Sequence, residues 1–323
     1  MDPVLQIRNL TTRFATKRGD LTAVDGVDLH ILPGETLGVV GESGCGKSVT
    51  ALSVLQLLPR PIARIAGGQI LFKGQDLVTA PLSVIRNIRG NQISMIFQEP
   101  MTSLNPVYTV GFQIMEPLKK HRGMKTAAAR QEAAGLLDLV GIPEPCARLD
   151  DYPHQFSGGM RQRVMIAMAL ACRPDLMIAD EPTTALDVTI QAQILELMKQ
   201  LQKETGMAIM LITHDLGVVA ETCHRVVVMY AGKMVESADV TMLFTRPAHP
   251  YTRGLFDSLP RRGCTGPLPT IRGAVPSLLN LPPGCAFQDR CDIAESRCRQ
   301  TPPWQEVTAG HGVRCWHPLA VGP

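Results

Sequence analysis

Residues 41–48 combine residue types that suit the binding of a phosphate chain. They read Gly-Glu-Ser-Gly-Cys-Gly-Lys-Ser, which fits the pattern GxxxxGK[ST]. An apolar run at 36–40 precedes them and an uncharged, mostly apolar stretch to about residue 58 follows, so we expect a strand, a loop and a helix. Glycines let backbone N–H groups approach phosphate closely, and a lysine adds charge near the terminal phosphates. We therefore predict a nucleotide site formed by Gly41, Ser43, Gly44, Cys45, Gly46, Lys47 and Ser48, with Ser48 as a Mg²⁺ ligand.

Polar side chains follow two further apolar runs. Asp180 and Glu181 come directly after the run at 176–179, and His214 follows the run at 208–213. Ligands bind at the carboxyl ends of strands in open α/β sheets, so these side chains are expected at one edge. Asp180 suits the Mg²⁺ shell, Glu181 suits the base that activates the attacking water, and His214 suits a contact to phosphate or water. Gln98 is a similar candidate for contacting Mg²⁺ or water.

A second phosphate-binding pattern appears at Ser157, Gly158 and Gly159, directly before an apolar helical stretch. A hydroxyl and glycine amides at a helix N-terminus can hold a phosphate. The chain already has one phosphate loop, so the simplest interpretation is a dimer. Each nucleotide would lie between the phosphate loop of one subunit and the serine-glycine segment of the other.

The elements that must position these residues indicate an α/β protein. Alternating apolar residues before the turn at 33–34 predict an N-terminal antiparallel β portion, and later helix-strand alternation predicts a largely parallel sheet. Strand signals thin out over about 91–172, which we interpret as an inserted helical subdomain. From about residue 247 proline and glycine recur, which predicts a loop-rich tail.

Composition narrows the possible partners and compartment. The 32 Lys and Arg against 29 Asp and Glu give a net charge of +3, too balanced to indicate a nucleic-acid partner. No charge-free apolar stretch approaches the ~20 residues of a transmembrane helix. The N-terminus lacks a signal-peptide pattern, so the reducing cytosol is expected.

Four cysteines stand close together in the tail. Cys285, Cys291, Cys298 and Cys315 lie in a segment too rich in loops to pack well alone, and Cys264 precedes them. A Cys₄ set suits either tetrahedral Zn²⁺ or a [4Fe–4S] cluster, and the spacing matches neither common pattern. From the residues alone, both metals and an unligated set of thiols remain open.

Taken in order, these motifs resemble those of ABC-transporter ATPases over residues 1 to about 250. The resemblance implies a P-loop nucleotide-binding domain at 1–250, a C-terminal extension at 251–323, and ATP and Mg²⁺ as cofactors. It implies that Ser157, Gly158 and Gly159 complete the partner's site, and that Asp187, after Ala185 and Leu186, links the two sites. The segment reads Phe-Ser-Gly-Gly-Met rather than Leu-Ser-Gly-Gly-Gln, which keeps the phosphate-contacting residues. Phe14 would stack on adenine, or else belong to the core of the first strand.

Within that family, residues 98–106 and 249–252 resemble the dipeptide/oligopeptide importer branch. This resemblance implies ATP hydrolysis coupled to peptide uptake, and a [4Fe–4S] cluster on the four cysteines. The implied partners are a second ATPase subunit of different sequence, two transmembrane permease subunits and an extracytoplasmic substrate-binding protein. The implied location is the cytoplasmic face of the cell membrane. The alternatives are a glutathione or nickel importer, or a soluble ABC ATPase without a transport role.

Overall fold

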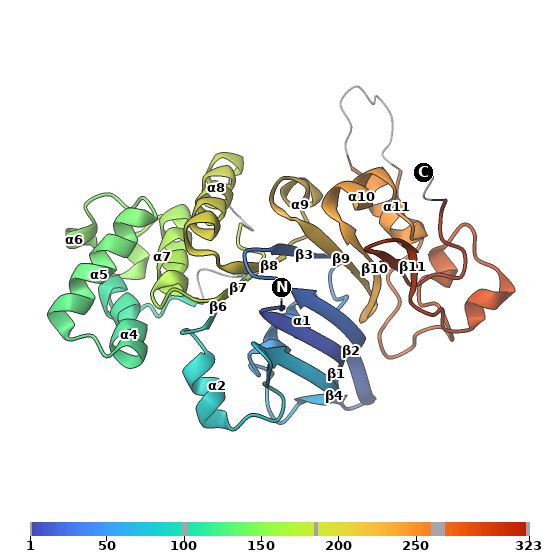
Figure 1. Ribbon diagram of the computed structural model, residues 1–323, viewed down its shortest axis with the longest axis horizontal. Coiled ribbons are helices and arrows are strands. Elements are labelled where there is room, and N and C mark those ends of the chain that lie inside the picture. Colours follow the sequence, from blue (N-terminus) through green and yellow to red (C-terminus); the bar gives the residue numbers. More distant parts are fainter. Residues whose placement is uncertain (1, 99–102, 184–186, 260–268, 321–323) are drawn as a thin grey trace. The chain divides into compact units, whose positions relative to one another are not determined.

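The computed structural model describes residues 2–98, 103–183, 187–259 and 269–320 (Figure 1). The chain divides into two units that interleave in sequence. The first unit comprises Met1–Leu5, Ile31–Glu35 and Phe72–Ile212, and the second comprises Gln6–His30, Thr36–Leu71 and Thr213–Pro323. Their bounds differ from those of the two expected domains at 1–250 and 251–323, because the C-terminal extension groups with the phosphate-loop region.

The first unit contains a parallel sheet with the strand order β8-β7-β6. Strand β7 and strand β8 are buried at every residue, as expected for a parallel strand covered on both faces. The bounds are β6 Ile93–Ile96, β7 Leu176–Asp180 and β8 Ala208–Ile212, with the short strand β5 at Gln75–Asp76. The predicted start of the helical segment at residue 91 is wrong, because β6 is a buried strand of this sheet.

The helices of the first unit include the predicted helical segment, drawn in green in Figure 1. Helix α4 begins after Thr109, whose hydroxyl accepts a hydrogen bond from the Phe112 N–H (3.3 Å), and ends at Gly123 with a left-handed backbone. Helices α4, α5 and α7 pack against one another. The bounds are α2 Leu82–Ile88, α4 Val110–Arg122, α5 Thr126–Leu139, α6 Pro145–Arg148, η1 Pro153–Gln155, α7 Gly158–Leu170 and α8 Val188–Thr205.

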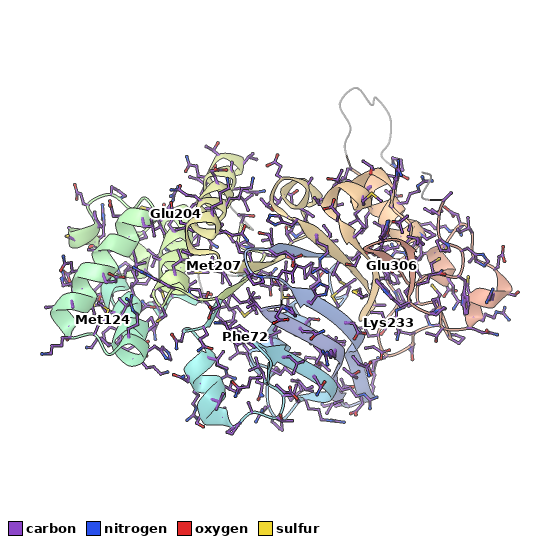
Figure 2. The ribbon with its side chains drawn as sticks, viewed as in Figure 1. Phe72, Met124, Glu204, Met207, Lys233 and Glu306 are labelled. Atoms are coloured by element: carbon purple, nitrogen blue, oxygen red, sulfur yellow. The ribbon has the colours of Figure 1, made fainter. Side chains whose placement is uncertain are left out.

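The second unit contains a sheet with the order β11-β12-β10-β9-β3, in which only β3 and β9 are parallel. Strands β1 and β2 belong to a separate sheet and run antiparallel, because two residues join them. Lys233, at the start of β10 and labelled in Figure 2, forms an ion pair with Asp25 of β2 (2.5 Å). The strand bounds are β1 Leu5–Thr16, β2 Gly19–Ile31, β3 Thr36–Val40, β4 Ala63–Phe72, β9 Arg225–Tyr230, β10 Lys233–Asp239, β11 Gln305–Thr308 and β12 His311–Val313.

The C-terminal extension carries more regular structure than its composition predicts. Strands β11 and β12 form a hairpin that pairs with β10, with Glu236 opposite Val313. Glu236 is fully buried, and its carboxylate accepts hydrogen bonds from the N–H groups of Ala248 (2.6 Å) and His249 (2.9 Å). The helices of the second unit are α1 Lys47–Val54, α9 Leu216–Thr222, α10 Val240–Thr245, α11 Pro250–Asp257, η2 Gln288–Arg290 and η3 Ser296–Arg299. No helix in the described ranges is long and apolar enough to cross a membrane.

Candidate active site

The phosphate loop has the strand-loop-helix context that the sequence predicts. Strand β3 is buried at every residue and ends at Val40, and helix α1 begins at Lys47. The Lys47 side chain is only 6% exposed, and its Nζ donates to the carbonyl oxygens of Gly41 (2.7 Å) and Glu42 (3.1 Å). The ammonium group therefore lies within the curve of the loop. Ser48 follows in the first turn and is half-buried.

Two glycines of this loop occupy positions that no other residue type fits. Gly41 has φ +146°, and a Cβ there would meet the backbone carbonyl of Met229. Gly46 has φ +106°, and a Cβ there would lie 2.5 Å from the carbonyl oxygen of Ala23. Both obstructions are backbone atoms, which cannot rotate away as a flexible side chain can. The glycines thus let β2 and β9 approach the loop closely.

Replacing Gly46 with alanine is expected to lower the free energy of unfolding by more than the ~1–2 kcal/mol that a left-handed backbone alone costs a non-glycine residue. The extra cost comes from the contact with Ala23. Gly44→Ala is the matched control, because Gly44 has φ +79° but nothing within 4 Å of its Cβ position. Chemical denaturation without nucleotide measures both variants. Equal losses of stability would contradict the close approach at Gly46.

The first unit brings together two of the predicted hydrolytic residues. Gln98 follows β6 and Glu181 follows β7, and the Gln98 Nε2 donates to the Glu181 Oε2 at 2.9 Å. The Glu181 N–H also donates to the carbonyl of Ile212 (2.8 Å), and its backbone has φ +49°. Asp180 ends β7 with 5% exposure. The carboxyl ends of β6 and β7 thus carry an amide and two carboxylates.

A buried glutamine that was not among the predicted site residues forms a hydrogen bond directly beside Glu181. Gln162 of α7 is 2% exposed, and its Nε2 donates to the carbonyl of Pro182, directly after Glu181. No local signal marked it, because Gln162 lies between Arg161 and Arg163 in the chain, and only its burial in the fold requires a hydrogen-bond partner. Gln162 joins the helix that begins at the serine-glycine segment to the loop that holds Glu181.

The serine-glycine segment and Asp187 begin neighbouring helices. Ser157 caps α7, its Oγ accepting from the Met160 N–H (3.4 Å), and Asp187 caps α8, its Oδ1 accepting from the Ile190 N–H (2.9 Å). A Cβ on Gly159 would lie 3.1 Å from the Cγ2 of Ile190. Ser157, Gly158 and Asp187 are exposed. Ala185 and Leu186 lie outside the described residues, as do residues 99–102 of the segment that follows Gln98 and Cys264 of the tail.

Phe14 and His214 belong to the same unit as the phosphate loop. Phe14 is half-buried on β1, two residues after Thr12, whose hydroxyl is 2.9 Å from that of Ser53 in α1. Side chains two apart on a strand share a face, so Phe14 lies on the face that meets α1. His214 is exposed, and the next residue, Asp215, caps α9. The roles of Phe14 and His214 remain predictions.

The four tail cysteines line one small cavity, together with His249, Phe287 and Trp316. Cys291, Cys298 and Cys315 are buried, and Cys285 is half-buried. Burial raises the pKa of Cys315 to about 11, against an opposing hydrogen bond from the His317 N–H. Within the described part of the chain, however, no three His, Cys, Asp or Glu side chains are arranged to hold a metal ion.

Comparison with known proteins identifies the class to which this site belongs. Residues 24–184 match the ABC transporter family, and residues 235–298 match the oligopeptide/dipeptide transporter C-terminal region. A dimeric ATP-binding cassette in a post-hydrolysis state, bound to ADP and Pi, is 28% identical with a TM-score of 0.66. That match covers 73% of this chain and 98% of the cassette. The chain belongs to the family of ABC transporter ATP-binding proteins, and the predicted α/β fold with an ABC-type nucleotide-binding domain is confirmed.

Full-length relatives narrow the family further. A probable peptide ABC transporter ATP-binding protein of Sinorhizobium fredii is 55% identical, over 98% of this chain and 95% of the relative. The dipeptide transport ATP-binding protein DppD of Bacillus subtilis is 53% identical over the same shares. The match therefore runs through the C-terminal extension as well as the nucleotide-binding domain, and it confirms the resemblance to the peptide-importer branch.

Proposed function

We propose that this chain hydrolyses ATP to drive the uptake of dipeptides or oligopeptides through separate permease subunits. The observation that carries the proposal is one chain with a phosphate loop, the Gln98–Glu181 pair and a peptide-transporter C-terminal region. The chain would act from the cytoplasmic face of the membrane, with an extracytoplasmic binding protein delivering the peptide.

Different residues of the chain would bind the phosphates, hold Mg²⁺, activate the attacking water and contact adenine. Backbone N–H groups of the loop and Lys47 would bind the phosphates, and Ser48, Gln98 and Asp180 would hold Mg²⁺, which neutralises charge on the β- and γ-phosphates. Glu181 would accept a proton from the attacking water at its carboxylate, with the Gln98 amide orienting that carboxylate at 2.9 Å. His214 would contact the γ-phosphate or the water, and Phe14 would stack on adenine.

Dimerisation would complete each site. Ser157, Gly158 and Gly159 are at the exposed start of α7, where N–H groups can meet the γ-phosphate of a nucleotide held by the other subunit. Asp187 would connect the two sites. We expect the second ATPase to be a different chain, with ATP closing the dimer and hydrolysis reopening it.

A docking surface for the permeases is offered by the helical segment. Val107, Tyr108 and Phe112 are 71%, 46% and 48% exposed, and the two rings stack with centroids 4.7 Å apart. Exposed apolar groups gathered in this way are typical of protein contact sites. The segment begins shortly after Gln98 in the chain, so a permease seated there would be linked to the hydrolytic residues.

ATP hydrolysis by the complex purified from its native membrane tests this function. The binding protein is added, and dipeptides, longer peptides, glutathione and Ni²⁺ are titrated separately. Stimulation by peptides alone supports the proposal, and stimulation by glutathione or Ni²⁺ reassigns the cargo. If no permease co-purifies and nothing stimulates hydrolysis, the importer assignment fails and a soluble ABC ATPase remains.

The cysteine cavity supports a second proposal, that the extension holds a [4Fe–4S] cluster. Its four thiols supply a suitable donor set, and backbone N–H groups of Phe287, Ile293 and His317 donate toward Cys285, Cys291 and Cys315. Such N–H bonds stabilise thiolate sulfur, as cluster ligands require. The thiols would have to move closer together than they lie here, because they do not form a metal-holding group in this structure. Zn²⁺ is the alternative ligand.

Anaerobic purification followed by metal and sulfide analysis is expected to give about four iron and four sulfide per chain. Cys298→Ser should lower both, whereas Cys146→Ser, at an exposed cysteine outside the extension, should not. One zinc without sulfide would replace the cluster by a structural Zn²⁺ site. If the analysis finds no iron, no sulfide and no zinc, the thiols are unligated and the cluster proposal fails.

A further inference from the structure

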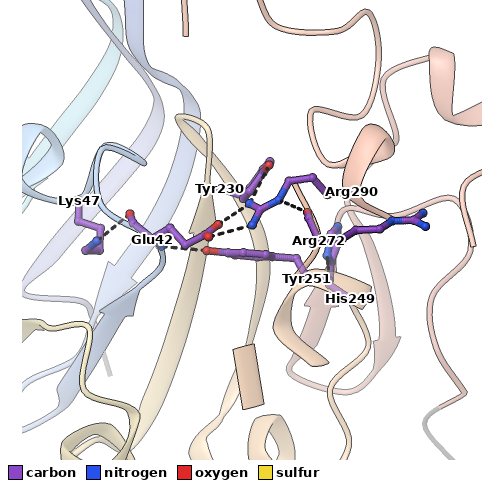
Figure 3. Close-up of polar contacts among 7 residues, drawn as sticks. All are labelled: Glu42, Lys47, Tyr230, His249, Tyr251, Arg272 and Arg290. Carbon is purple, nitrogen blue, oxygen red and sulfur yellow. Dashed lines mark hydrogen bonds and ion pairs between the residues drawn. The ribbon is translucent and has the colours of Figure 1, made fainter. Parts of the chain in front are cut away.

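Arg290 of the C-terminal extension pairs with the phosphate loop (Figure 3). Its Nη1 donates to the Glu42 Oε2 at 2.7 Å and its Nη2 donates to the Glu42 Oε1 at 3.0 Å. This bidentate geometry is the strongest form of an arginine–carboxylate pair. Arg290 is 7% exposed and the Glu42 side chain is 28% exposed, so water is excluded from the arginine and partly from the carboxylate. The two residues are 248 positions apart, and both belong to the second unit.

The guanidinium is held from the extension side as well. Its Nε donates to the carbonyl of Arg272 (3.0 Å), and its Nη1 also lies 3.3 Å from the Tyr230 hydroxyl. The rings of Tyr230 and Phe287 lie 5.8 Å and 5.9 Å from it. Arg272 in turn donates to the carbonyl of Cys291 (2.9 Å), which lines the cysteine cavity. Arg290 is therefore fixed before it meets Glu42, and little side-chain freedom is lost in forming the pair.

Glu42 is the second residue of the phosphate loop and is held at three places. Its carboxylate meets Arg290, its N–H donates to the Tyr251 hydroxyl (2.8 Å), and its carbonyl accepts from Lys47 (3.1 Å). Two of these three contacts come from residues beyond position 250, on α11 and η2. The extension therefore fixes both the backbone and the charge of a residue that also contacts the phosphate-binding lysine.

A carboxylate in a phosphate loop opposes phosphate binding unless its charge is neutralised. An unpaired Glu42 carboxylate would repel the nucleotide phosphates. It would also compete with those phosphates for the ammonium group of Lys47, which already contacts the Glu42 carbonyl. We propose that Arg290 is a positioning residue of the nucleotide site, which pairs with Glu42 from the C-terminal extension and thereby sets the affinity of the phosphate loop for ATP. The proposal rests on ATP being the nucleotide bound, and it assigns part of the site to the extension.

The test is direct binding of ATP, with and without Mg²⁺, to the full chain by calorimetry. Arg290→Gln leaves the partly buried Glu42 carboxylate unpaired beside the phosphates, and we expect ATP binding to weaken about tenfold. The double variant Glu42→Gln with Arg290→Gln removes both charges, and it should recover most of the lost affinity. Arg290→Lys, which keeps the charge but not the bidentate geometry, should fall between. Arg299→Gln, at an exposed arginine of the same extension, is the matched control.

The pattern of results separates this role from a purely structural one. If Arg290 only stabilises the extension, the double variant binds ATP no better than Arg290→Gln, and the inference is overturned. Unchanged ATP affinity in a folded Arg290→Gln variant overturns it as well. If Arg290→Gln does not fold, Arg290→Lys is compared with the double variant Arg290→Lys with Glu42→Gln. Tighter ATP binding by the double variant supports the inference, and equal or weaker binding overturns it. A wild-type chain that binds no ATP would instead refute the proposed function.

Discussion

Replacing Glu181 with glutamine is expected to reduce ATP turnover by about 10²–10⁴-fold, the usual contribution of a general base. Glutamine keeps the shape of the side chain but cannot accept a proton from water. ATP binding should persist, because the phosphate loop and Asp180 are untouched. The ATP-bound dimer should therefore accumulate, and size-exclusion chromatography with ATP and Mg²⁺ measures it together with phosphate release.

Glu196→Gln is the matched control for this variant, because Glu196 is an exposed glutamate of α8. It should hydrolyse ATP at the wild-type rate. Wild-type turnover in the Glu181→Gln variant would remove Glu181 from the role of base. Gln98, whose amide lies 2.9 Å from the Glu181 carboxylate, would also lose the role of orienting it.

Replacing Lys47 with methionine is expected to weaken ATP binding by about 100-fold or more, because charge-assisted hydrogen bonds are each worth ~1.5–3 kcal/mol. Methionine keeps much of the apolar stem in the 6% exposed position but supplies no donor to phosphate. The Gly41 and Glu42 carbonyls also lose their lysine contacts. Calorimetry with ATP measures the affinity, and turnover should fall with it.

Lys119→Met provides the comparison, because Lys119 is an exposed lysine on α4. We expect it to bind ATP with wild-type affinity. Thermal unfolding without nucleotide shows whether the Lys47→Met chain is folded. A folded Lys47→Met variant that binds ATP normally would contradict the assignment of residues 41–48 as the nucleotide site.

The local structure around the nucleotide motifs was predictable from the sequence. The phosphate loop is eight consecutive residues, and its backbone shape is fixed by glycines and by the strand and helix beside it. The positions of Asp180 and Glu181 were predictable, because a buried and mostly apolar strand of five residues ends at Asp180. In each case the chemical group and the element that positions it are neighbours in the chain, so spacing alone carries the information.

Strand assignments failed where the pairing partner decided the structure. Strand β6 has only four residues, and it is a strand because β7 lies parallel to it. The β11–β12 hairpin lies in a tail rich in proline and glycine, and its pairing with β10 stabilises it. Short segments such as these have too weak an intrinsic preference to show their structure before a neighbouring strand supplies the hydrogen bonds.

The sequence by itself determined the class of chemistry, the nucleotide motifs and the presence of a cysteine-bearing extension. Only the tertiary structure decided that Gln98 meets Glu181, that Gln162 holds the loop beside it, and that Arg290 pairs with Glu42. These contacts join residues far apart in the chain, and neither partner belongs to a spacing pattern that implies the other. All three depend on hydrogen-bond geometry, and those of Gln162 and Arg290 also on burial, which exist only once the chain has folded.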